Sequence, residues 1–166
     1  MNAPYTGKFK ITQGYTHGVH DGLDLVGIDS KEIHATVSGV VEYAGWENPN
    51  DKKQGFGQYV KIIDNNSDYG FYYGHMSEIK VKVGQSVRVG DVIGIEGSTG
   101  YSTGSHCHYC IRKNGRGTDI NVSDFSGIPN TTGGIFDDGY RPGSESDTIE
   151  ITVKINNKTY TGKIRA

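Results

Sequence analysis

The sequence predicts an all-β fold in which antiparallel strands form a sandwich or a partial barrel. Glycine accounts for 25 of the 166 residues, and the chain has 11 tyrosines but only two methionines. This composition is typical of short strands joined by tight turns. Apolar residues recur with a period of two in most segments, and no long stretch follows the helical period of 3.6. The length suits one ordinary domain with a hydrophobic core and a small appendage.

Short β-like runs follow one another between glycine-rich turns. The clearest alternation lies in residues 79–97, where Val81 and Val83 precede a Gly84-Gln85 turn and Val87 follows it. Because successive side chains of a strand point to opposite faces, this pattern predicts a sheet with one apolar face. We assign strands to residues 33–45, 57–64, 69–76, 79–97 and 106–112, and to the alternating Leu23 and Leu25.

Two polar segments are predicted to be loops, and the second divides the chain. Residues 47–57 are long for a hairpin connection, so they either wall a groove or form a mobile surface loop. Residues 129–147 are rich in Gly, Ser, Asp and Pro, which predicts a linker between a domain at 1–128 and an appendage at 148–166. The appendage alternates around Asn156-Asn157, which predicts a lone β-hairpin that needs a partner surface.

Charge and hydropathy argue against two classes of partner. The net charge of -2 gives no electrostatic reason to expect binding to nucleic acid or to an anionic membrane. No stretch approaches the roughly 20 consecutive apolar residues of a membrane span, so we expect no membrane insertion. The first ten residues lack the apolar centre of a secretory signal. A protein that acts outside the cell would therefore need another route of delivery.

The histidines cluster beside glycines in a way that predicts a metal site. In a strand, His106 and His108 project from the same face, about 6.6 Å apart. The stretch THGVHDGLD offers a histidine followed four positions later by an aspartate twice, as His17 with Asp21 or as His20 with Asp24. Only the second pair has a glycine midway between its two residues, as HxGxD, and leads directly into the Leu23 strand. We therefore place His20 and Asp24 in the site and His17 and Asp21 on the loop outside it.

The donor types in these clusters favour zinc. Zn²⁺ binds histidine nitrogen and aspartate oxygen, and a catalytic site uses three protein ligands and leaves the fourth position to water. Bound zinc brings the pKa of that water toward about 7, which supplies a hydrolytic nucleophile at neutral pH. Spare histidines can then act as acid, base or oxyanion stabiliser.

Three segments, HDGLD, YGHM and VRVGDVIGIEGSTGYSTGSHCHYCI, resemble in this order the lysostaphin-type (LytM-like) zinc metallopeptidases, which cut peptidoglycan peptides. The family pattern is HxxxD, a lone histidine after an aromatic strand, and a GxTGxSTGxHxH run. The similarity covers about residues 10–125, and the last run is highly specific. It implies a narrow groove with zinc at its floor and with residues 47–57 and 98–105 as walls.

The resemblance also implies a role for each matching residue. His20, Asp24 and His108 would be the zinc ligands. His106 would be the general base for the zinc-bound water, and His75 would orient that water or stabilise the oxyanion. Tyr15 is the candidate for a tyrosine that helps to hold the oxyanion. The remaining histidine, His34, is expected at the surface or at a strand start.

The chain departs from the family where the usual HLHFE reads HCHYC. Because side chains alternate between the two faces of a strand, Cys107 and Tyr109 should face away from the metal. Cys110 shares the face of His108 and should pack under the site or bind adventitious metal. The Cα atoms of the two cysteines should lie roughly 10 Å apart, beyond the roughly 7 Å limit for a disulfide, so we expect free thiols. A redox CxxC normally opens a helix, which this context lacks. The glycine-rich GDVIGIEGSTGYSTG lacks the GKS or GKT ending of a phosphate-binding loop.

The implied function is zinc-dependent endopeptidase activity on the stem or cross-bridge peptides of bacterial peptidoglycan, through zinc-activated water. The narrow groove favours small residues, as in oligoglycine or D-Ala links. The enzyme would act at the cell wall, outside the cell or in the periplasm, as a phage lysin or tail-associated enzyme whose hairpin contacts partner domains, or as a domain of a bacterial protein. The alternative is a catalytically inactive wall-binding or regulatory module of the same fold. One or two of five aromatic residues should touch substrate: Trp46, Phe56, Tyr72, Tyr73 and Tyr101.

Overall fold

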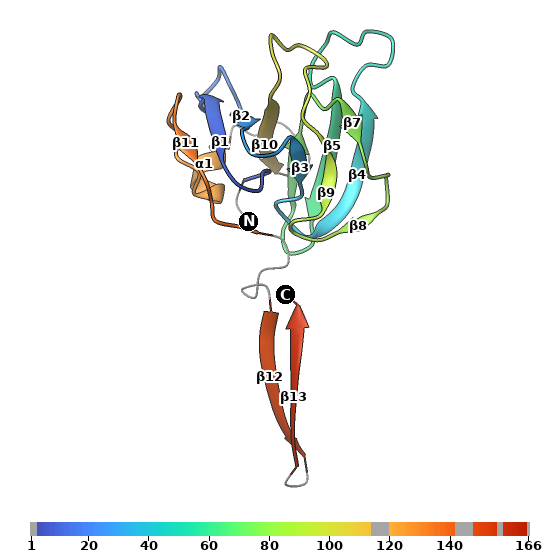
Figure 1. The fold of residues 1–166 in the computed structure, drawn as a ribbon. Coiled ribbons are helices and arrows are strands. Elements are labelled where there is room, and N and C mark those ends of the chain that lie inside the picture. The colour runs from blue at the N-terminus through green and yellow to red at the C-terminus, as the bar shows by residue number, and fades with distance from the viewer. Residues whose placement is uncertain (1–2, 114–119, 142–147, 156–157, 166) are drawn as a thin grey trace.

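Antiparallel β-strands make up almost all of the regular structure (Figure 1). The computed structural model describes residues 3–113, 120–141, 148–155 and 158–165, the last two ranges as backbone only. Within these ranges one short helix is present, α1 (Val122–Ser126), which Asn121 caps by accepting a hydrogen bond from the Ser123 amide. The prediction of an all-β fold is confirmed.

The largest sheet has eight strands in the order β11-β1-β2-β10-β6-β5-β4-β8. Its edge strands, β11 and β8, do not pair with each other, so the sheet is not closed into a barrel. The bounds of its strands are β1 (Phe9–Gln13), β2 (Gly22–Gly27), β4 (Gly39–Trp46), β5 (Gln58–Asp64), β6 (Tyr69–Tyr73), β8 (Ser86–Val87), β10 (Cys107–Lys113) and β11 (Ile135–Phe136).

A second sheet of three short strands shares the core with the first. It has the order β3-β9-β7, formed by β3 (Glu32–His34), β9 (Val92–Ile95) and β7 (Glu78–Ile79). Ile33 and Ile93 of this sheet are fully buried in the same apolar cluster as Val41, Val60 and Ile62 of the large sheet. Burial of one face of each sheet against a common core is what the period-two pattern requires.

The structure divides two predicted segments further. The run 79–97 contains β8 and β9 and begins at the end of β7; β8 belongs to the large sheet, whereas β7 and β9 pair in the small one. The predicted linker 129–147 contains β11, which extends the large sheet by pairing with β1 at Phe9↔Phe136. Neither β1 nor β11 was expected from the sequence, because each carries only a few alternating positions.

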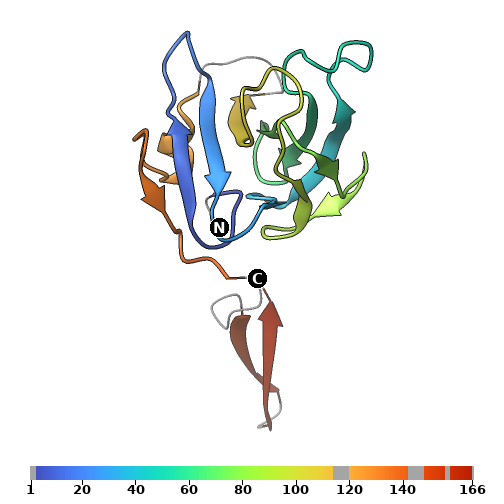
Figure 2. The same ribbon diagram turned by 45° about the horizontal axis from the view of Figure 1, so that its top comes forward.

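The C-terminal residues form the predicted hairpin. Strands β12 (Thr148–Ile155) and β13 (Lys158–Arg165) pair antiparallel from Thr148↔Arg165 to Ile155↔Lys158. The predicted turn at Asn156-Asn157 lies outside the described residues. Both views draw the hairpin apart from the large sheet (Figures 1 and 2). In the described ranges no helix is long and apolar enough to cross a bilayer.

Candidate metal and catalytic site

The register of two neighbouring strands brings the predicted zinc ligands together. Strands β2 and β10 pair antiparallel with His108 directly opposite Asp24. Opposite residues of an antiparallel pair project from the same face with their Cβ atoms about 4.5–5.5 Å apart. His20 reaches the pair from the turn before β2, where its backbone exchanges two hydrogen bonds with Thr16, at 2.8 and 2.9 Å.

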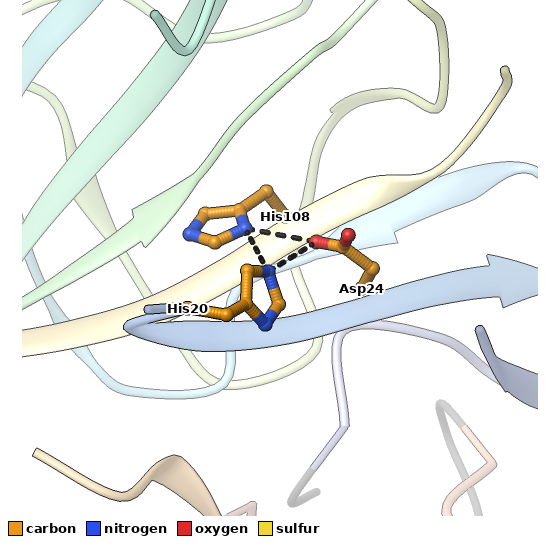
Figure 3. A group of neighbouring side chains, drawn as sticks. All are labelled: His20, Asp24 and His108. Atoms are coloured by element: carbon orange, nitrogen blue, oxygen red, sulfur yellow. Dashed lines mark hydrogen bonds and ion pairs between the residues drawn. The ribbon is translucent and has the colours of Figure 1, made fainter. Parts of the chain in front are cut away.

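Three side-chain atoms converge at this point (Figure 3). His20 Nε2 lies 3.1 Å from Asp24 Oδ1 and 3.2 Å from His108 Nδ1, and His108 Nδ1 lies 2.8 Å from Asp24 Oδ1. Ligands about 2.0–2.2 Å from a tetrahedral zinc would be separated by roughly 3.3 Å. The triangle of atoms therefore has the size that a zinc ion requires.

Hydrogen bonds on the far side of each ring decide which nitrogen faces the centre. His20 Nδ1 lies 2.8 Å from the Gly14 carbonyl oxygen, and His108 Nε2 lies 3.2 Å from Asp21 Oδ1. Both partners are acceptors, so these two nitrogens carry the protons and the inward nitrogens carry lone pairs. Two nitrogen lone pairs and a carboxylate oxygen that face one another need a cation between them.

Electrostatics at the triangle agree with a cation site. Burial opposes the charge of Asp24, but contacts with His108 and His20 outweigh it and hold the pKa of the carboxyl well below its usual range. Burial also disfavours a charged His108, yet hydrogen bonds with Asp21 and Asp24 raise its pKa well above the ordinary value. In the absence of metal a proton takes the place of the cation on His108.

Gly22 makes room for the His108 ring. A Cβ on Gly22 would lie 2.9 Å from ring atoms of His108 and 2.6 Å from the Tyr109 carbonyl oxygen. No side chain fits there without displacement of the ring. The glycine between His20 and Asp24 is therefore required by close approach to the third ligand.

Two further histidines stand beside the triangle. His106 Nδ1 lies 2.8 Å from the Gly104 carbonyl oxygen, and its Nε2 lies 3.6 Å from Asp24 Oδ1. The ring centroid of His75 is 4.5 Å from that of His106 and 6.0 Å from that of His108. The structure thus gathers all five histidine and aspartate residues of the predicted site.

His75 is held in an unusual backbone conformation. Its φ is +62°, in the left-handed region that non-glycine residues seldom adopt. Its amide donates to the Phe56 carbonyl at 2.7 Å, and its Nδ1 donates to the Thr99 carbonyl oxygen at 2.7 Å. Burial lowers the pKa of His75 to about 4; the hydrogen bond with Thr99 opposes this shift, and the nearby His106 and His108 add to it. The ring is therefore neutral at neutral pH, with the Nε2 lone pair free to accept a hydrogen bond.

A groove of about 530 Å³ opens over the site. Its lining includes the four site histidines, Asp24 and residues of three loops. The predicted wall segments, 47–57 and 98–105, are hydrogen bonded to each other through Tyr101 N to Gly55 O at 2.9 Å, so they form one continuous wall. Val19, which is 81% exposed, lines the groove from the β1–β2 side. Of the five aromatic candidates, Phe56 and Tyr101 line the groove, whereas Tyr73 is fully buried.

The remaining predicted residues have different settings. The Tyr15 hydroxyl lies 3.3 Å from His17 Nδ1. Its role at the oxyanion stays a prediction. His34 is buried, with 3% exposure, and is the last residue of β3, so the expectation of a histidine at the surface or at a strand start was wrong. Cys107 and Cys110 are free thiols, as predicted, and both are buried.

Sequence reasoning missed Asp21 and Arg112. We expected Asp21 outside the site, but its Oδ1 contacts His108 Nε2, and Arg112 Nη2 donates to its Oδ2 at 2.7 Å. The physical reason is the pairing of β2 with β10, which brings the residue after His20 beside the outer edge of the His108 ring. The spacing within either motif gives no signal of this contact.

The matched family and its members agree with this site. Residues 18–120 match the sequence family described as Peptidase family M23. Lysostaphin of Staphylococcus staphylolyticus is 38% identical over 96 residues, which are 58% of this chain and 19% of that protein. The glycyl-glycine endopeptidase ALE-1 of Staphylococcus capitis is 35% identical over 96 residues, 58% of this chain and 25% of that protein. The murein hydrolase activator NlpD of Escherichia coli is 35% identical over 113 residues, 68% of this chain and 28% of that protein.

Solved structures of catalytic domains have the same fold. The catalytic domain of lysostaphin from Staphylococcus simulans is 30% identical, with a TM-score of 0.59 over 74% of this chain and 92% of that chain. The catalytic domain of a variant of the prophage-encoded M23 protein EnpA from Enterococcus faecalis is 32% identical, with a TM-score of 0.61 over 73% and 95%. The chain therefore spans less than a third of the three relatives named above, but nearly the whole of these two domains.

Proposed function

The chain belongs to peptidase family M23, whose members are zinc-dependent, and from this membership we propose that it is an endopeptidase that hydrolyses peptide bonds in bacterial peptidoglycan. The observation that carries the proposal is the convergence of the inward atoms of His20, Asp24 and His108 beneath an open groove. Two further histidines, His75 and His106, stand beside these three atoms, so both the ligands and the acid–base groups of a hydrolase are present.

The side chains support a division of roles in the hydrolysis. Bound zinc would act as a Lewis acid that polarises the peptide carbonyl and lowers the pKa of water. His106 is suited to accept a proton from the attacking water, because its Nδ1 is engaged by Gly104 and its Nε2 faces the site. His75 is neutral and its Nδ1 is engaged by Thr99, so its Nε2 can orient the water by accepting a hydrogen bond.

The substrate we favour is a flexible peptide of small residues, in the cross-bridge or the stem. Two observations support this choice. The loops 47–57 and 98–105 wall the groove and are held in place by a hydrogen bond to each other. The chain is also similar to a glycyl-glycine endopeptidase. The likeness to the domain of a prophage-encoded M23 protein supports a phage lysin or tail-associated enzyme that acts at the cell wall. In this role the hairpin β12–β13 would contact partner domains.

The proposal is tested with the whole chain, by zinc content, clearing of a cell-wall suspension and mass spectrometry of fragments from defined muropeptides. The wild type should carry one zinc and release fragments cut within the peptide. His106→Ala should retain zinc but lose turnover by about 100-fold or more, because general base catalysis contributes about 10²–10⁴. Wild-type turnover by this variant would refute the role of His106, and a zinc-loaded wild type that cuts no muropeptide would refute the proposed activity.

A regulatory module is the second candidate function. Similarity to a murein hydrolase activator supports it, over 68% of this chain. Such a module would bind cell walls without releasing peptide fragments. The retention of His75 and His106 beside the three ligand atoms favours the enzyme. The clearing assay and the fragment analysis described above separate the two candidates, because a regulatory module would release no peptide fragments.

A further inference from the structure

Asp21 and Arg112 form an ion pair at the outer edge of the His108 ring. Asp21 Oδ1 lies 3.2 Å from His108 Nε2, on the side of the ring away from Asp24 and His20. Arg112 donates to Asp21 Oδ2 from Nη2 at 2.7 Å and from Nε at 3.2 Å. Each carboxylate oxygen thus has a separate partner. The ligand ring, the carboxylate and the guanidinium form a chain of hydrogen bonds.

We propose that this pair positions His108 for the metal: Asp21 fixes the tautomer and the plane of the ring, and Arg112 fixes Asp21. The inference rests on the proposed zinc-dependent function. A carboxylate can only accept, so the Asp21 contact keeps the proton on Nε2 and leaves the lone pair on Nδ1, which faces the other two ligands. Partners of this kind orient metal ligands and raise their basicity.

Arg112 is itself held by two aromatic rings. Its guanidinium carbon lies 5.1 Å from the ring centroid of Phe56 and 5.0 Å from that of Tyr72. Phe56 also packs against the His108 ring, with 5.5 Å between centroids. A guanidinium in contact with two rings has few alternative rotamers, so it can hold the carboxylate in one geometry. The pair also contributes no net charge to the site.

The same residues could be taken for a second metal site or for a substrate anchor. The ligand atoms of Asp21, His108 and Cys110 lie within 4.8 Å of one another. However, the guanidinium of Arg112 already occupies Asp21 Oδ2, and its positive charge repels a second cation. Arg112 also lines the groove and could bind a substrate carboxylate. The experiment has to separate these roles from positioning.

The decisive measurement is zinc affinity, by competition with a chromogenic chelator and with the whole chain. Asp21→Asn keeps the shape of the side chain but removes its charge, and it should weaken zinc binding by about 10- to 100-fold. Activity lost at limiting zinc should return in excess zinc, with an unchanged KM. Asp21→Ala should show the same loss and serves as the second variant. Asp124→Asn, on the exposed face of α1, is the matched control and should bind zinc as the wild type does.

Coupling between the two residues tests the role of Arg112. Arg112→Met should weaken zinc binding several-fold in the wild type, but should have no further effect in the Asp21→Asn background, because Arg112 acts through Asp21. Wild-type zinc affinity in Asp21→Asn would overturn the inference, as would a raised KM that excess zinc does not correct. Two zinc ions in the wild type and one in Asp21→Asn would show a metal site instead. A wild type without zinc would overturn the proposed function as well.

Discussion

Two histidines three positions apart should differ sharply in zinc binding. His20 Nε2 belongs to the ligand triangle, and its Nδ1 is bound to the Gly14 carbonyl. His17 is exposed and contacts the Tyr15 hydroxyl. We therefore expect His20→Ala to lose zinc and activity, because only two protein ligands remain, and His17→Ala to retain both. Zinc content after dialysis checks this, and loss of zinc from His17→Ala would contradict the assignment of the ligand pair.

At the scale of single residues, the sequence predicted the inward groups of the site but not their supports. The resemblance located His20, Asp24, His75, His106 and His108, and the structure brings all five together. The Asp21 contact depends on which strand lies beside β2, and the left-handed backbone of His75 depends on contacts with Phe56 and Thr99. Both are properties of the assembled fold. Residue types and their spacing within a motif therefore do not predict either the Asp21 contact or the backbone conformation of His75.

At the scale of elements, the contact between the two groove loops should control turnover through His75. Gly100 has a φ of +76°, and a Cβ on it would lie 2.3 Å from the Gly57 amide nitrogen. Gly100→Ala should therefore force the loops apart and displace Thr99, whose carbonyl holds His75 Nδ1. We expect a large fall in kcat with zinc retained, and a loss of stability above the roughly 1–2 kcal/mol for a left-handed alanine.

Gly84→Ala is the matched control for this prediction. Gly84 has a φ of +83°, but no atom lies within 4 Å of the position of its Cβ. It should cost about 1–2 kcal/mol of stability for the backbone conformation alone and leave kcat unchanged. Chemical unfolding and steady-state kinetics on both variants separate the two effects. Equal kcat values for the two variants would mean that the loop contact does not position His75.

The strands were easier to predict than their arrangement. Residue patterns located β4, β5, β6 and β10: β4 and β5 bury alternate residues, whereas β6 and β10 bury consecutive residues on both faces. Short edge strands such as β11, with two residues, carry too few positions for a period to be visible. The assignment of β7, β8 and β9 to two sheets is a matter of long-range pairing, which local patterns do not determine.

At the scale of the whole molecule, one buried carboxylate joins segments that are far apart in sequence. The side chain of Glu96 has no exposed surface. It accepts hydrogen bonds from the Tyr5 hydroxyl at 2.7 Å, the Gly27 amide at 2.8 Å, Lys31 Nζ at 2.8 Å and the Ser105 hydroxyl at 2.6 Å. These donors lie before β1, at the end of β2, before β3 and next to His106. Glu96 therefore ties the N-terminal segment to the loop that carries the proposed base.

This network predicts a specific dependence of stability on pH. Burial opposes the charge of Glu96, but the hydrogen bonds from Lys31, Ser105, Tyr5 and Gly27 outweigh it and lower the pKa below its ordinary value of 4.5. Because the folded-state pKa is lowered, the stabilisation is complete above the unfolded pKa and is lost as the pH falls through the folded pKa. Glu96→Gln should thus lower the free energy of unfolding by about 3 kcal/mol at pH 7. The difference from the wild type should shrink below pH 4, where the wild-type carboxyl becomes protonated in the unfolded chain and then in the folded one.

Urea unfolding across this pH range measures the difference in unfolding free energy between the two proteins. Glu78→Gln, on the exposed face of β7, is the isosteric control. If the free energy of unfolding of Glu96→Gln stayed below that of the wild type by a constant amount from pH 7 to pH 3, packing, and not the ionised network, would hold these segments together.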